Sequence, residues 1–235
     1  MKIKDIIKKI IYKERCSQEE YIKYLKKIGI SIGSNCRIFD PKTNIIDIQN
    51  PYLLTIGENV KITSGVIILT HDYSWSVIAN VKGEILGNVG YVNIGNNVFI
   101  GMNSIILKNT KIGDNVIIGA GSIVSGNIES NSVYAGNPAK KIMSIDEFYK
   151  KRKEQQMQDI KLILKTIKNK YNRLPTKKEL REYFWMYTNM ENISEEDEKL
   201  IERVGNKKII YERLKNKENE FESMEELLKF CEENL

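Results

Sequence analysis

His71 is the single histidine of the 235-residue chain, and its chemistry is the first that the sequence offers. Imidazole exchanges a proton near neutral pH, so a well-placed histidine is a candidate general base. A zinc site of the three-histidine kind needs more imidazoles, and Cys16, Cys36 and Cys231 lack the spacing of metal ligands. The sequence therefore predicts chemistry without a metal ion.

An aliphatic residue recurs at every sixth position in the middle of the chain, and the run comprises Ile94, Ile100, Ile106, Ile112, Ile118 and Val124. A period of six is neither that of an α-helix nor the alternation of a hairpin. It is typical of a β-helix, in which each side of a coil is one short strand plus one turn. The aliphatic side chains are expected to point inward, with Gly, Asn and Asp at the corners.

The same register extends upstream, and its aliphatic members there are Ile32, Ile38, Ile56, Ile62 and Ile68. Asn44 and Asn50 occupy two intermediate positions, either because they face an acceptor cleft or because the coil is distorted. The step from Ile68 to Ile94 breaks the register unless most of the segment leaves the coil, at about residues 72–91. So long a loop is usually functional, and this one begins directly after His71.

The flanking regions have helical patterns. Residues 2–12 place their isoleucines on one face, and Ser17 with Glu20 forms a capping box that opens a second helix. Further capping pairs, which predict four or five helices in the C-terminal region, are Ser144/Glu147, Thr176/Glu179, Ser194/Asp197 and Ser223/Glu226. We therefore expect N-terminal helices over 1–28, a β-helix over 29–143 and a helical domain over 144–235.

The net charge of +6 is concentrated near the N-terminus, because residues 1–30 carry nine basic and four acidic side chains. Without a basic stripe along the main domain, nucleic acid is a poor partner. The basic N-terminal helix is expected either to cover the open first coil or to lie on an anionic membrane. No transmembrane helix or secretory signal is expected, and an odd number of cysteines favours a reducing cytoplasm.

Residues 50–72 and 92–142 together resemble the hexapeptide-repeat acyltransferases, which fold as left-handed parallel β-helices and use acetyl-CoA. The element THD, followed by a loop and then IGNNVFIG, is most similar to the O-acetyltransferases of capsular and other surface polysaccharides and to the maltose and galactoside type. The left hand comes from the resemblance alone, since parallel crossovers are usually right-handed. The resemblance also implies a homotrimer with active sites at the subunit interfaces.

Residues around the loop are candidates for roles in the reaction, those of His71 and Met102 by the resemblance and those of Asp72, Tyr73 and Trp75 by their chemistry. His71 would take the proton of a sugar hydroxyl, the alternative being a structural corner histidine. Asp72 would orient His71 or a substrate hydroxyl, although adjacent strand residues point to opposite faces and a solvated turn aspartate is the alternative. The backbone N–H of Met102, from a neighbouring subunit, would stabilise the oxyanion. Tyr73 and Trp75 would pack against sugar rings or anchor the loop.

The resemblance places the coenzyme A site along the later coils. Gly119, Ala120 and Gly121 would let the pantetheine arm approach the backbone, unless the glycines only serve turn geometry. Ser125 continues the matching stretch. Lys140, with Lys141 beside it, would bind a coenzyme A phosphate. Phe99 would form a flat wall beside the pantetheine arm or pack between subunits.

The sequence thus predicts an acetyl-CoA-dependent O-acetyltransferase that acts on a sugar hydroxyl of a surface polysaccharide or its precursor. Two alternatives stay open. One is N-acetylation of an amino-sugar nucleotide, and the other is a non-catalytic β-helix scaffold.

Overall fold

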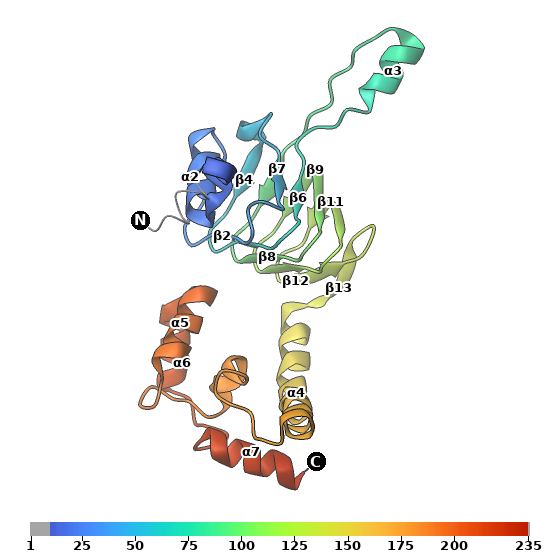
Figure 1. Ribbon diagram of the computed structural model, residues 1–235. Helices are drawn as coiled ribbons and strands as arrows, with labels where there is room; N and C mark the ends of the chain where they lie inside the picture. The colour runs from blue at the N-terminus through green and yellow to red at the C-terminus, as the bar shows by residue number, and fades with distance from the viewer. Residues whose placement is uncertain (1–9, 235) are drawn as a thin grey trace. The chain divides into compact units, whose positions relative to one another are not determined.

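The computed structural model describes residues 10–234, and these fall into two compact units that divide between Phe148 and Tyr149 (Figure 1). Most of the predicted first helix, residues 2–12, lies outside the described residues. A 3-10 helix, η1 (Lys13–Cys16), precedes the helix α2 (Gln18–Lys27). The Ser17 hydroxyl accepts a hydrogen bond from the Glu20 backbone N–H at 3.2 Å, so the predicted cap of α2 is confirmed.

The first unit is a coil of short parallel strands. In chain order they are β1 (Ser31–Ile32), β2 (Arg37–Ile38), β3 (Ile45–Ile46), β4 (Leu54–Ile56), β5 (Lys61–Ile62), β6 (Ile67–Ile68), β7 (Val92–Ile94), β8 (Val98–Ile100), β9 (Ile105–Ile112), β10 (Val116–Ile118), β11 (Ile123–Ile128), β12 (Ser132–Ala135) and β13 (Lys140–Ser144). A short 3-10 helix, η2 (Pro51–Leu53), precedes β4. One sheet has the order β13-β12-β10-β8-β5-β2, and the other has the order β1-β4-β7-β9-β6-β3 with β11 on β9. The β12–β13 pair is antiparallel.

The long strand β9 passes through a corner of the coil and so belongs to two sides. Its first part pairs with β6, through Ile68 and Ile106, and its last part pairs with β7, through Ile94 and Ile112. Together with the β2–β5–β8–β10 stack this makes three sides, as Figure 1 shows in the green strands. The residues of the six-residue register are buried, with Ile100, Ile106 and Ile118 at 0% exposure. The predicted inward position of these residues is confirmed.

The coils differ in length. In the regular part a coil consists of three hexapeptide repeats, so Val98 pairs with Val116. Across the predicted excursion Ile68 pairs with Ile106. The chain between these partners therefore forms one regular coil and, in addition, the segment that projects from the coil. In the first coil, however, Ile32 pairs with Ile56 and Ile46 with Ile68, and both partners lie further along the chain than three repeats would place them.

The long first coil corrects the predicted register upstream of Ile56. Asn44 is fully buried, and its side chain donates to the carbonyls of Phe39 (2.7 Å) and Asp40 (3.1 Å). Its Oδ1 accepts from the Val66 backbone N–H at 3.0 Å. Asn44 therefore satisfies backbone groups of a distorted coil and does not face a cleft.

One corner of the coil is built from stacked asparagines in the left-handed backbone region. Asn59, Asn97, Asn115 and Asn131 have φ angles of 57°, 55°, 56° and 58°. Each side-chain amide donates to the next side-chain carbonyl along the stack, at 3.0, 2.9 and 2.8 Å. Asparagine tolerates this conformation better than most residues, which agrees with the predicted use of Asn at the corners.

The helix α2 covers the first coil. Tyr21 and Leu25 are fully buried in the same core as the coil's aliphatic residues. The Arg15 guanidinium donates to the carbonyls of Pro41 (3.2 Å) and Asn44 (2.8 Å), which ties the N-terminal segment to the distorted coil. The segment that covers the first coil is therefore η1 with α2, while most of the basic helix expected at residues 2–12 lies outside the described residues.

The second unit is helical and has its own core. Its elements are α4 (Ile145–Tyr171) from Tyr149 onward, η3 (Arg181–Met186), α5 (Glu195–Val204), α6 (Lys207–Lys215) and α7 (Met224–Glu233). Ser144 with Glu147, Ser194 with Asp197, and Ser223 with Glu226 form the predicted cap bonds. Thr176 and Glu179 bond to each other but open only a turn before η3, so the helix predicted there is wrong. Among residues 10–234, no helix is both long enough and apolar enough to span a bilayer.

Candidate active site

The excursion from the coil is a two-legged arm, residues 72–91, which projects from the strands in Figure 1. It contains one helix that the sequence did not predict, α3 (Trp75–Lys82), which ends at Gly83 in the left-handed region. The legs meet at the base of the arm, where His71 forms an antiparallel bridge with Val89 and the Gly90 N–H donates to the Thr70 carbonyl at 2.8 Å. His71 is therefore held at the junction of arm and coil.

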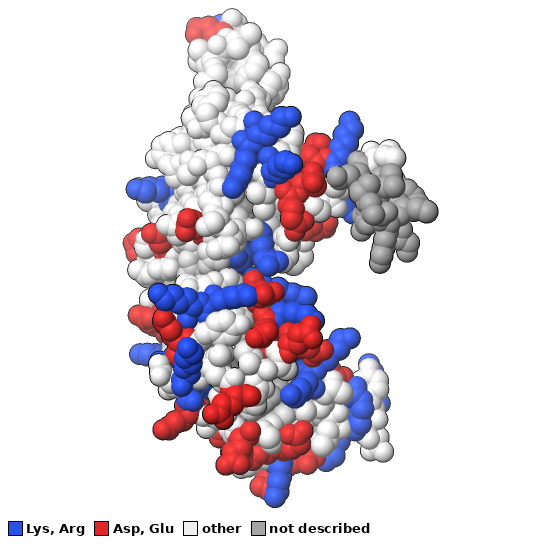
Figure 2. Space-filling model, turned by 90° about the vertical axis from the view of Figure 1, so that its left-hand side faces the viewer, with Lys and Arg blue, Asp and Glu red and all other residues white. Residues whose placement is uncertain are grey.

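The surface of the arm is mostly uncharged, as Figure 2 shows at the top of the view. Between Tyr73 and Tyr91 its only charged residues are Lys82 and Glu84. Its exposed large apolar side chains are Tyr73, Val77, Ile78, Val81, Ile85, Leu86, Val89 and Tyr91. Surface of this kind is typical of a region that another molecule covers.

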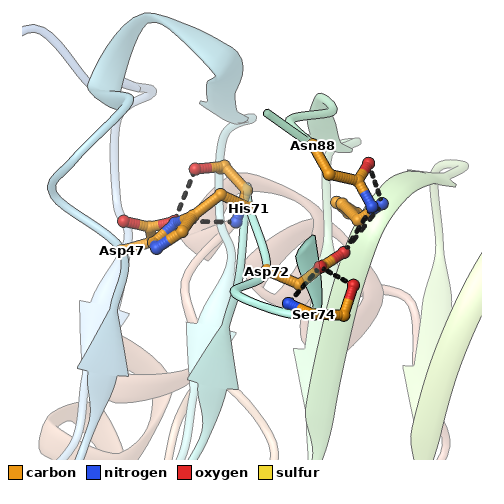
Figure 3. A network of polar contacts seen from close by, with 7 residues as sticks. Asp47, His71, Asp72, Ser74 and Asn88 are labelled. Carbon is orange, nitrogen blue, oxygen red and sulfur yellow. Dashed lines mark hydrogen bonds and ion pairs between the residues drawn. The ribbon is translucent and has the colours of Figure 1, made fainter. Parts of the chain in front are cut away.

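His71 contacts a carboxylate from the first coil, as Figure 3 shows. Its Nδ1 lies 2.5 Å from Oδ2 of Asp47, which follows β3. The Asp47 side chain is 4% exposed and that of His71 is 30% exposed. The pair thus combines a buried carboxylate with an imidazole that solvent can reach.

Asp47 is held by three further hydrogen bonds. Its Oδ2 accepts from the backbone N–H (2.9 Å) and the hydroxyl (2.6 Å) of Thr70, and its Oδ1 accepts from the Gln49 N–H (2.9 Å). Burial by itself would raise the pKa of Asp47, but the hydrogen bonds from Thr70, Gln49 and His71 outweigh it and lower that pKa. The carboxyl group is therefore ionised at neutral pH.

The charge of Asp47 decides which nitrogen of His71 carries the proton. An ionised carboxylate only accepts hydrogen bonds, so Nδ1 must be the donor in this contact. A neutral imidazole with its proton on Nδ1 has a lone pair on Nε2. The pair can therefore take a proton at Nε2, while Asp47 stabilises the imidazolium that results.

Asp72 does not orient His71, which corrects that part of its predicted role. Figure 3 shows it in a separate network, where Oδ1 accepts from the Ser74 N–H (3.0 Å) and hydroxyl (2.5 Å). Its Oδ2 accepts from the Asn88 amide (2.7 Å) and lies 3.1 Å from the Lys108 ammonium. The bonds from Ser74 and Lys108 lower the pKa of Asp72 to about 2. Asp72 therefore joins the two legs of the arm to β9.

Asp47 is the residue that sequence reasoning missed. A regular coil would put Leu53 one coil below His71, whereas the observed pairing of Ile46 with Ile68 puts Gln49 there, close to Asp47 in the chain. The signal that could have found it is the strand Ile45–Ile46 followed at once by a carboxylate. That signal does not by itself place Asp47 beside His71, because the prediction also needs the length of the first coil.

The turn that contains Met102 is held on both sides. The Gly101 N–H donates to the Ile118 carbonyl at 2.8 Å, and the Asn103 N–H donates to that of Ser64 at 3.1 Å. The Met102 side chain is 52% exposed. Phe99, on β8, points outward with 42% exposure.

The predicted coenzyme A residues lie at the later coils of the same unit. Ala120, Ser125 and Lys140 are at least partly exposed, while the Lys141 ammonium is 2.6 Å from the Glu129 carboxylate. A Cβ on Gly119 would lie 2.8 Å from that of Ala135, so this glycine serves close packing between coils. At Gly121 the backbone has φ +69° and faces open space. An open backbone suits the approach of a pantetheine arm, and the exposed Lys140 suits a phosphate group.

The two aromatic residues at the start of the arm contact each other. The ring centroids of Tyr73 and Trp75 are 4.5 Å apart with an interplanar angle of 57°. Tyr73 is nevertheless 69% exposed. Both predicted roles, packing against a sugar and anchoring the loop, are compatible with this geometry. Within residues 10–234, no group of three or more His, Cys, Asp or Glu side chains could hold a metal ion.

Known proteins are similar to this chain. A family model described as bacterial transferase hexapeptide (six repeats) matches residues 91–126, from just before β7 into β11. Protein CapG of Staphylococcus aureus is 41% identical over 157 residues, which cover 63% of this chain and 90% of that protein.

Two solved structures are also similar. A maltose O-acetyltransferase from Clostridium difficile 630 is 27% identical and has a TM-score of 0.39, covering 54% of this chain and 75% of that one. A galactoside acetyltransferase in complex with coenzyme A is 25% identical and has a TM-score of 0.44, covering 62% of this chain and 84% of that one.

The identity with CapG extends over nearly the whole of that protein, and the repeat model falls on the most regular coils. The chain therefore belongs to the hexapeptide-repeat acyltransferase family of bacterial enzymes.

Proposed function

We propose that this enzyme transfers the acetyl group of acetyl-CoA to a sugar hydroxyl of a surface polysaccharide or its precursor, with His71 as the general base. The observation that carries the proposal is the contact between the buried Asp47 carboxylate and His71 Nδ1, which leaves Nε2 to accept a proton. A sugar hydroxyl is a weak nucleophile at neutral pH, so its attack needs a base of this kind.

In the proposed reaction, bound acetyl-CoA supplies an acyl group activated as a thioester. His71 Nε2 removes the proton of the acceptor hydroxyl as its oxygen attacks the thioester carbonyl, and Asp47 balances the positive charge that forms on the imidazole. The C–S bond then breaks, and the coenzyme A thiolate leaves with the proton returned from His71, which restores the base. The backbone N–H of Met102 would stabilise the negative charge that develops on the carbonyl oxygen. The exposed backbone near Ala120 and Gly121, with Lys140, would bind coenzyme A.

We further propose a left-handed coil, as the family resemblance implies, and a homotrimer whose interfaces contain the active sites. The apolar arm supports the trimer, since Val77, Val81 and Ile85 are 66%, 70% and 75% exposed in the single chain. The free thiols of Cys16, Cys36 and Cys231 favour a cytoplasmic enzyme. A peripheral membrane contact would involve residues 2–12, most of which lie outside the described residues.

The test is release of free coenzyme A from acetyl-CoA against a panel of oligosaccharides and nucleotide sugars. We expect turnover with a saccharide that offers only hydroxyl groups. Turnover confined to amino-sugar nucleotides would replace O-acetylation with N-acetylation.

The matched variant is His71→Ala, which should lower kcat by about 10²- to 10⁴-fold without loss of the fold or of the oligomer. Circular dichroism and mass measurement check the fold and the oligomer. Near-normal turnover by a folded His71→Ala enzyme would exclude the proposed base.

A further inference from the structure

The helical unit contains a cavity of about 900 Å³. It lies between one face of α4, the 3-10 helix η3, and the end of α6 with the segment that follows it. Every residue that lines it belongs to residues 149–220. Its volume is at the upper end of the range for ligand sites. The proposed acetyl transfer gives this cavity no role.

Three aromatic residues, Tyr149, Tyr183 and Trp185, line the cavity. Tyr149 is 59% exposed, and the other two are half-buried. Half-buried rings beside an open cavity offer flat apolar faces to a ligand. The C–H faces of sugar rings pack against such surfaces.

The aromatic groups are held in place by polar contacts. The Lys217 ammonium donates to the backbone carbonyl of Trp185 and lies 5.3 Å from the centroid of its ring. The Tyr183 hydroxyl donates to Asp159 at 3.4 Å. Both rings are therefore fixed before a ligand arrives, which lowers the entropic cost of binding.

The charges around the cavity balance. Four basic residues (Arg152, Lys153, Arg213 and Lys217) face four acidic ones (Asp159, Glu182, Glu218 and Glu220). Figure 2 likewise shows both signs interspersed over the helical unit. A polyanion would prefer an excess of positive charge. A neutral ligand whose groups both donate and accept hydrogen bonds fits this lining better, and sugar hydroxyls are such groups.

We propose that this cavity binds a neutral saccharide segment of the acceptor, apart from the hydroxyl that reacts at His71. The saccharide class rests on the proposed function, while the cavity and its chemistry do not. A saccharide that binds both in the cavity and at His71 gains affinity through effective concentration. Long acceptors would then be used better than short ones.

The two tryptophans of the full chain provide a direct reporter. In a Trp75→Phe variant, Trp185 is the sole tryptophan, so its emission reports on the cavity. We expect a saturable shift on titration with maltoheptaose or chitotetraose. A Trp185→Phe variant, whose remaining tryptophan is Trp75 on the arm, is the control, and any shift that it shows reports on the arm and not on the cavity.

A second pair of variants links the cavity to binding. Asp159→Asn in the Trp75→Phe background should raise the Kd for the oligosaccharide about tenfold. Glu154→Gln, an exposed carboxylate on the same helix that does not line the cavity, should leave it unchanged. Equal affinities in the two variants would overturn the proposal.

The outcomes separate this inference from the proposed function. His71→Ala should lose acetyl transfer and keep the Trp185 shift, whereas Asp159→Asn should keep turnover of a monosaccharide and raise KM for a long acceptor. The absence of a saturable shift with every neutral oligosaccharide would overturn the cavity assignment. A shift seen only with polyglutamate or heparin would overturn it as well.

Discussion

The regular coils and the first coil of the same β-helix differ in length and in what they contribute to the protein. Between Val98 and Val116 the chain completes a coil of three hexapeptide repeats, with buried aliphatic side chains on every side. The first coil is longer, since Ile46 reaches its partner only at Ile68, and its extra length contains the buried polar residues Asn44 and Asp47. The regular coils thus form the aliphatic core, and the longer first coil places the Asp47 carboxylate beside His71.

The sharpest test of this contrast compares Asp47→Asn with Asp72→Asn. Removing the charge of Asp47 should lower kcat about 100-fold, because Nδ1 of His71 is then no longer held as the donor. Asp72→Asn is the matched control, since Asp72 bonds to Ser74, Asn88 and Lys108 rather than to His71.

Steady-state acetyl transfer measures both variants, and we expect Asp72→Asn to change kcat only a few-fold. If Asp72→Asn lost as much kcat as Asp47→Asn, the first coil would not be the source of the orienting carboxylate.

A smaller effect, on stability, distinguishes an inward position of a regular coil from an outward position of the first coil. Ile106→Ala, at a fully buried position of a regular coil, should lower the free energy of unfolding by about 2–5 kcal/mol. Ile45→Ala, an outward position of the first coil with 54% exposure, should cost well under half of that. Urea unfolding measures both, and equal losses would contradict the inward register.

The smallest expected effect is a pH dependence of stability that comes from Asp47. Its pKa in the folded chain lies below the ordinary value of 3.8, so the unfolded chain binds the proton more tightly. The contribution to stability is therefore complete above pH 3.8 and is lost as the pH falls toward the lower folded pKa. Asp47→Asn should flatten the unfolding free energy in that acidic range, and an unchanged slope would show that other carboxylates dominate it.

Much of the fold follows from local pattern. The six-residue period and the isoleucines identify the coil, and the break in that period between Ile68 and Ile94 requires an excursion after His71. The caps at Ser17, Ser144 and Ser194 mark helix starts, because the bonds that stabilise them lie within a few residues. Upstream of Ile56 the period misled, because insertions lengthen the coil there without a compositional sign.

By itself, the sequence determined the repeat, the position of the arm and the identity of the candidate base, since each depends on spacing along the chain. Only the tertiary structure decided that Asp47, from the preceding coil, contacts His71, while the adjacent Asp72 does not. The physical reason is that successive strand residues point to opposite faces, and contacts between coils depend on the length of each turn. The aromatic cavity of the helical unit likewise arises from packing among α4, η3 and the segment after α6, which no local pattern specifies.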